Sequence, residues 1–303
     1  MYTQCDMQLK ETPAAICENA FDEYGVPQID DARPRWTIIR RITDKQDKAV
    51  FVAVDTKFSV VGLGGLGDKI SLVAIKACQL SESTYKDLVR GARVAASMSH
   101  ESIVKIFDVV VDKSNAYCIM EYLDPSEWVR ADSESSTLNI ATVLSLSSKL
   151  VDVIEYMENN NVVHADLQLR NIFISNDAQR IKLIDFDISS ISLDQANKLE
   201  VAYFSKKPYH TDHLMLLNFI LAGFGYVGRE EVFDATDFFQ EVDSGNIGRV
   251  SESVFIELQP IIRKLRQKAY FSVSEMVVDL NNCSFVASVG GIRTAKRSNN
   301  DAA

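Results

Sequence analysis

Three short motifs, in a fixed order along the chain, constrain its fold more than any other feature of the sequence. The first is Val-Ala-Ile-Lys, which ends at Lys76 in a run typical of a strand. The second is His-Ala-Asp-Leu-Gln-Leu-Arg-Asn, in which Asn171 follows Asp166 by five residues. The third, Asp-Phe-Asp, begins at Asp185, fourteen residues after Asn171. A fold that uses all three must bring a strand lysine, two carboxylates and an amide to one site.

These four groups are the ones needed to bind a nucleoside triphosphate with magnesium and to transfer its terminal phosphoryl group. A lysine neutralises phosphates, and Mg²⁺ prefers oxygen ligands, usually one or two carboxylates together with phosphate and water. Each residue alone has an ordinary alternative. A strand lysine is usually a solvated charge, and an aspartate in a loop is usually a turn or cap residue. Their order and spacing favour the joint site.

The length and charge of the chain limit the classes of protein to consider. With 303 residues it can build one large core or two lobes around a cleft. Its net charge of −10 argues against a general nucleic-acid-binding protein, which normally presents a basic surface. The most apolar run, residues 214–228, is short for a bilayer span and predicts a buried helix, so we expect no membrane span.

The cysteines indicate a reducing compartment. There are five, they are scattered, and none has the C-x-x-C spacing of a zinc or redox site. The N-terminus also lacks the charged and apolar pattern of a secretory signal peptide. We therefore expect a cytoplasmic location, with export by a route that uses no signal peptide as the alternative, and the oligomeric state is left open.

Two regions of different periodicity follow a polar leader at residues 1–34. In the first, 35–123, β-branched and aromatic runs predict strands at 36–42, 50–58, 71–78, 103–111 and 116–121. One helix is expected in this region, at 81–98. In the second, 124–282, apolar residues at helical spacing predict helices at 138–159, 212–222, 254–267 and 272–281. Residues 283–303 are expected to form a polar tail.

From residue 36 to about residue 281, the chain resembles a protein kinase of the eukaryotic type. The resemblance rests on the three motifs and on two further stretches, 99–104 and 116–123. It implies an α+β fold of two lobes, a β-rich N-lobe and a helical C-lobe. It also implies ATP with Mg²⁺, or alternatively Mn²⁺, and a protein substrate that carries the accepting hydroxyl group.

The resemblance assigns a role to each motif residue. Asp166 matches the catalytic base, and Lys76 matches the lysine that holds the α- and β-phosphates. Asn171 and Asp185 match the two metal ligands. Arg170 resembles the catalytic-loop arginine of tyrosine kinases, which keeps tyrosine open as an alternative to the expected serine or threonine acceptor.

The implied nucleotide site includes backbone groups and a phosphate loop. Met120 takes the gatekeeper position, and the backbone of Glu121 and Leu123 would bind adenine. The glycines of the family's phosphate loop are absent from this chain, which makes close backbone approach to phosphate harder. Lys45 or Lys48 would compensate with positive charge.

Two features near the first motif depart from the family pattern. A Gly-x-Gly-x-x-Gly sequence at 62–67 joins the second and third expected strands instead of the first and second, so we interpret it as a hairpin connection. Gly91 stands where the helix should carry a glutamate that pairs with Lys76. Asp87, one turn earlier, is a shorter substitute.

Further departures lie around the other two motifs. Ala165 replaces the arginine that reads a phosphorylated activation loop, which predicts that the chain is not switched in that way. Gln168 replaces the lysine of serine/threonine kinases, and Asp187 replaces a glycine. Only about 27 residues separate Asp185 from Asp212, with no A-P-E motif between them.

Three functions fit these observations. The first is an active but atypical ATP-dependent protein kinase, because the metal, base and lysine residues are all present. The second is a pseudokinase that acts as a nucleotide-binding scaffold or allosteric partner, which Gly91 and the altered phosphate loop favour. The third is a small-molecule kinase similar to the aminoglycoside and choline phosphotransferases, which share the acidic motifs and lack a long activation segment.

Overall fold

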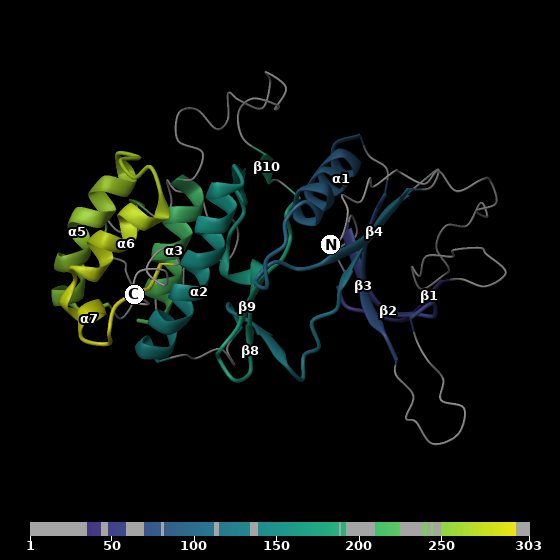
Figure 1. Ribbon diagram of the computed structural model, residues 1–303, viewed down its shortest axis with the longest axis horizontal. Coiled ribbons are helices and arrows are strands. Elements are labelled where there is room, and N and C mark those ends of the chain that lie inside the picture. The colour runs from purple at the N-terminus through teal and green to yellow at the C-terminus, as the bar shows by residue number, and fades with distance from the viewer. Residues whose placement is uncertain are drawn as a thin grey trace, which may run out of the picture. The chain divides into compact units, whose positions relative to one another are not determined.

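The computed structural model describes residues 35–43, 48–58, 70–79, 82–111, 115–133, 139–187, 189–191, 210–224, 239–240, 244 and 250–294. The chain divides into two compact units. The first contains the described residues up to Met98 together with Val104–Asp124, and the second contains Ser99–Ile103 and the residues from Pro125 onward. The antiparallel first sheet and the helices that follow it confirm the α+β class (Figure 1).

The first unit is a five-stranded antiparallel sheet with one helix, α1 (Glu82–Ala96), lying against β3, β4 and β5 (Figure 1). The strand order is β1-β2-β3-β5-β4. The strands are β1 (Trp36–Arg41), β2 (Lys48–Asp55), β3 (Leu72–Gln79), β4 (Ile106–Val111) and β5 (Asn115–Glu121). All of them overlap the predicted strands, because β-branched runs suit a pleated, half-buried surface.

Side chains alternate between the two faces of β3, and each face has its own core. Val73, Ile75 and Ala77 belong to one buried cluster with residues of β1, β2 and β5. Cys78 belongs to a second cluster, which contains residues of α1, β4 and β5. Lys76 is two residues from Cys78, so its side chain leaves the sheet on the face that α1 covers.

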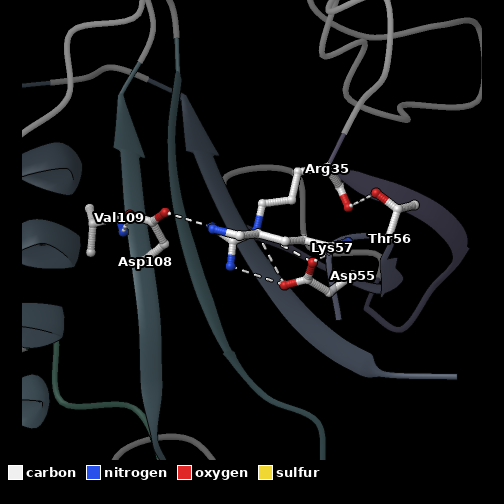
Figure 2. A network of polar contacts seen from close by, with 6 residues as sticks. All are labelled: Arg35, Asp55, Thr56, Lys57, Asp108 and Val109. Atoms are coloured by element: carbon white, nitrogen blue, oxygen red, sulfur yellow. Dashed lines mark hydrogen bonds and ion pairs between the residues drawn. The ribbon is translucent and has the colours of Figure 1, made fainter. Parts of the chain in front are cut away.

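One arginine connects the two edges of this sheet (Figure 2). Arg35, which precedes β1, donates to both oxygens of Asp55 at the end of β2, with its Nη2 3.1 Å from Oδ2. Its Nη1 lies 3.3 Å from Oδ2 of Asp108 on β4. Since β1 and β4 are opposite edges, this ion pair shows that the sheet is strongly curled. The guanidinium also lies 4.8 Å from the ring centroid of Trp36.

The second unit is mainly helical. Its helices are α2 (Ile140–Asn159), α3 (His210–Ala222), α5 (Glu252–Arg266), α6 (Val273–Asn281) and α7 (Ser284–Ala287). A three-stranded sheet in the order β6-β8-β9 is formed by β6 (Trp128–Arg130), β8 (Ile172–Ser175) and β9 (Ile181–Leu183). A two-residue strand, β7 (Val162–Val163), pairs with β10 (Ser190–Ile191).

Helix α3 forms the centre of the core of this unit. It contacts both α2 and α5, and almost all of its side chains are buried, including those of its apolar run from Leu214 to Leu221. This confirms the buried helix expected for the first part of residues 214–228. No helix of the described chain is both long and apolar enough to cross a membrane.

The structure differs from the sequence expectation at two places. The strand expected at 103–111 begins only at Ile106, because Ile103 belongs to the second unit and pairs with Leu183. Within the expected polar tail, residues 284–287 form α7, and Val286 and Ile292 are buried. These two apolar side chains pack into the core, although the segment as a whole is polar and was therefore expected to be an exposed tail. The leader 1–34 and the glycine-rich 62–67 lie outside the described residues.

We predict that replacing Arg35 with methionine destabilises the protein by about 1–3 kcal/mol, because it removes a charged donor from a buried acceptor. Asp55 is only 2% exposed, so water cannot fully replace the guanidinium. Urea denaturation measures the change. Arg40→Met is the matched control, since Arg40 is an exposed arginine of the same sheet. Equal stability of the two variants would contradict the prediction.

Candidate active site

Two amide side chains hold the carboxylate of Asp166 in the second unit. Asn171 donates from Nδ2 to Oδ2 of Asp166 at 3.1 Å and to its backbone carbonyl at 2.8 Å. Gln168 donates from Nε2 to Oδ1. Because the NH₂ group of Asn171 faces two acceptors, its carbonyl Oδ1 must point elsewhere. The orientation leaves that oxygen available as a metal ligand.

His164 connects this loop to the segment that carries the third motif. Its Nδ1 accepts from the backbone N–H of Asp166 at 3.3 Å, and its Nε2 lies 3.0 Å from the carbonyl of Ile184. Since Nδ1 accepts, the proton that reaches Ile184 is on Nε2. The ring also packs against Phe186, with centroids 4.4 Å apart. The two rings thus pack between the loop that carries Asp166 and the segment that carries Asp185.

The pairing of β8 with β9 brings the two expected metal ligands to one end of a hairpin. Ile172 pairs with Leu183, the last residue of β9, and Ile184, which follows it, donates its N–H to the carbonyl of Asn171 at 3.0 Å. Asp185 follows directly, with a left-handed φ of 64° and a partly exposed side chain. Register alone therefore places Asn171 and Asp185 on adjacent chain segments.

Asp212 anchors the loop from the start of α3, a role that sequence reasoning did not assign. Its carboxylate accepts the backbone N–H groups of His164 at 2.9 Å and Ala165 at 3.1 Å. Asp212 is 1% exposed, and this burial raises its pKa above the ordinary 3.8. Ala165 has φ of 64°, a conformation that costs an alanine energy, so the two bonds hold a strained turn.

The oxygen donors present fit Mg²⁺ as one component of a larger complex. Within the described ranges, no group of three or more His, Cys, Asp or Glu side chains is arranged to hold a metal. Mg²⁺ commonly uses only one or two protein ligands with substrate phosphates and water. Asn171 and Asp185 match this pattern, and it requires the phosphates to complete the coordination.

Lys76, in the first unit, is 8% exposed and lies opposite Cys118 of β5. The suggested substitute partner on α1 has a different contact: Asp87 accepts from Arg90 at 2.9 Å. Gly91 is buried in the same helix. The structure therefore gives no direct support to pairing of Asp87 with Lys76.

The expected adenine-binding backbone lies at the end of β5. The N–H of Glu121 donates to the carbonyl of Lys105 at 2.8 Å. In the part of the chain that the structure describes, the backbone of Leu123 makes no hydrogen bond. Lys45 lies outside the described residues, and Lys48 is placed only as the first residue of β2.

Arg170 lies in the 3₁₀ turn Leu169–Asn171, between the two amides that hold Asp166. It is partly buried. Its guanidinium makes no hydrogen bond or ion pair with any described residue. The turn is closed by the N–H of Asn171, which donates to the carbonyl of Gln168 at 2.8 Å. The guanidinium of Arg170 is therefore able to bind an anion from outside the described residues.

We predict that the stability advantage of the native protein over Asp212→Asn decreases as pH rises. A carboxyl whose folded-state pKa is raised stabilises the fold fully below its unfolded value, 3.8, and loses this contribution as pH rises through the folded value. Denaturant titrations at several pH values from about 5 to 8 measure the difference in unfolding free energy. A difference that widens with pH would contradict a pKa raised by burial.

Comparison with known proteins agrees with this geometry. The family described as "Protein kinase domain" matches residues 57–209, just over half of the chain. Serine/threonine-protein kinase Pkn1 of Myxococcus xanthus is 32% identical over 43% of this chain and 20% of its own length. Putative serine/threonine-protein kinase R436 of Acanthamoeba polyphaga mimivirus is 26% identical over 51% of this chain and 53% of its own length. Tyrosine-protein kinase TXK of Homo sapiens is 28% identical over 46% of this chain and 26% of its own length. The chain thus spans from a fifth to about half of the length of these relatives, and it belongs to the protein kinase domain family.

Proposed function

We propose that the chain is an active protein kinase that transfers the γ-phosphoryl group of ATP to a hydroxyl group on a protein. The observation that carries the proposal is the carboxylate of Asp166, oriented by Asn171 and Gln168 and followed at the end of the β8–β9 hairpin by Asp185. Hydrogen bonds to both oxygens fix the orientation of this carboxylate, which is what a catalytic base requires. Two of the relatives named above are serine/threonine kinases, which favours those acceptors.

In the proposed reaction, Asp166 orients the acceptor hydroxyl and takes its proton. The hydroxyl oxygen forms a new bond to the γ-phosphorus, and the bond from that phosphorus to the β,γ-bridging oxygen breaks, so its electron pair leaves with ADP. Lys76 holds the α- and β-phosphates. Asn171 and Asp185 would hold Mg²⁺, which would supply positive charge that neutralises the phosphate oxygens.

We also propose that this activity does not depend on phosphorylation of an activation loop. Ala165 cannot bind a phosphate as an arginine would. The start of the segment after Asp185 is instead tied to the catalytic loop by protein contacts. Ser189 donates from Oγ to the carbonyl of His164 at 3.1 Å, and β10 pairs with β7.

A cytoplasmic location also remains our proposal, supported by three buried cysteines that form no disulfide.

A pseudokinase is the second candidate, and the contacts of α1 favour it. Gly91 provides no carboxylate, and Asp87 is engaged with Arg90. In the family, a glutamate on this helix orients the phosphate-binding lysine, so a helix without that carboxylate favours the pseudokinase. Nucleotide binding without turnover separates this candidate from the first.

We predict that Asp166→Ala reduces phosphate transfer from radiolabelled ATP by at least about 100-fold, because it removes the base. Asp185→Ala should abolish transfer too, through loss of a metal ligand. The thermal shift on adding Mg-ATP distinguishes the two: Asp166→Ala keeps it and Asp185→Ala loses it. Asp132→Ala, an exposed carboxylate of the same unit, is the control. A native protein that shifts without any transfer is a pseudokinase.

We predict that phosphatase treatment leaves the rate of transfer unchanged within about twofold, because Ala165 has no group to read a phosphate. The measurement compares initial rates before and after treatment, with the phosphatase removed and dephosphorylation checked by intact mass. A large fall in rate after complete dephosphorylation would contradict the proposal of phosphorylation-independent activity.

A further inference from the structure

Gln168 makes a contact that neither its residue type nor the family resemblance requires. Its Nε2 donates to Oδ1 of Asp166, while Asn171 donates to Oδ2 of the same carboxylate. The two oxygens of the expected base are therefore held by two separate amides. Neither amide carries a charge, although a lysine is usual at position 168 in serine/threonine kinases.

The backbone explains why Gln168 reaches this carboxylate. Gln168 has an extended backbone, with φ −118° and ψ 159°, and its amide reaches the carboxylate two residues before it. Leu167, between them, is fully buried. The carbonyl of Gln168 also accepts the N–H of Asn171 at 2.8 Å, which fixes the turn that follows. The side chain of Gln168 thus leaves an anchored backbone on the side of Asp166.

We propose that Gln168 is a positioning residue for phosphoryl transfer, which acts by fixing the rotamer of Asp166 through Oδ1. This inference rests on the proposed function and deepens it. A base must lie within hydrogen-bond reach of the hydroxyl proton, so freedom of its carboxylate lowers the rate of the chemical step. ATP binding is served by other residues, and the effect therefore falls on kcat and leaves the KM for ATP unchanged.

Three substitutions separate orientation of Asp166 from simple filling of space. Gln168→Ala removes the donor. Gln168→Glu keeps nearly the same size but places a carboxylate against Oδ1, so it replaces attraction by repulsion. Gln168→Lys keeps a donor that is long enough to reach Oδ1. Gln179→Ala is the matched control, because Gln179 is an exposed glutamine on the turn between β8 and β9.

The experiment measures kcat and the KM for ATP of each variant, with melting temperature and the Mg-ATP thermal shift as readouts besides activity. We expect kcat to fall about tenfold in Gln168→Ala and further in Gln168→Glu, with a KM within about twofold of native. Gln168→Lys should stay within about threefold of the native kcat, and the thermal shift should be unchanged in all variants.

Two results would overturn the inference while leaving the proposed function intact. In the first, Gln168→Ala and Gln168→Glu retain the native kcat although Asp166→Ala is inactive. In the second, Gln168→Lys loses as much activity and melting temperature as Gln168→Ala, which is the result for a purely structural side chain. If Asp166→Ala is as active as the native protein, the proposed function itself fails.

Discussion

The buried carboxylate of Asp212 is the interaction on which the catalytic loop depends. Two backbone N–H groups, those of His164 and Ala165, have their hydrogen bonds satisfied by this one side chain, 48 and 47 residues away in the chain. A hydrogen bond to a charged group contributes about 1.5–3 kcal/mol, enough to offset the cost of a left-handed alanine. Because α3 is buried on nearly all sides, the anchoring carboxylate belongs to a helix inside the core of its unit.

A second constraint is the register of β8 with β9, which positions the backbone next to Asn171 and Asp185, the two expected metal ligands. The backbone of Ile184, just before Asp185, is held by two contacts: its N–H donates to the carbonyl of Asn171, and its carbonyl accepts from the ring of His164. A shift of register by one residue would turn each side chain to the opposite face of the strand and would break both contacts. The site is therefore set by backbone pairing and one buried acid, and the side chains that would do the chemistry project from that frame.

The sequence allowed most of the elements to be predicted, along with the identity of the motif residues, because strand and helix periodicities and short motifs are local. It did not reveal the role of Asp212, whose partners are far away in the chain. The one signal in the sequence was an acidic residue at the start of an otherwise apolar helix. Gln168 was recognised as a departure from the family, but its contact with Asp166 depends on an extended backbone that the sequence does not specify. The assigned roles of Lys45 and Lys48 stay predictions.

Two positions near the motifs, 91 and 168, carry no charge where the family usually has one, and this affects phosphoryl transfer. Lys76 has lost the glutamate expected on α1, and Gln168 has replaced a lysine, so one position loses a negative charge and the other a positive one. The replacement at 168 still makes a hydrogen bond to Asp166, whereas Gly91 has no side chain with which to contact anything. Position 168 thus keeps an orienting contact to the expected base, while position 91 provides no counterpart of the family's helix carboxylate. Phosphoryl transfer depends on both positioning and electrostatics, so the contact at 168 is the one that favours an active site.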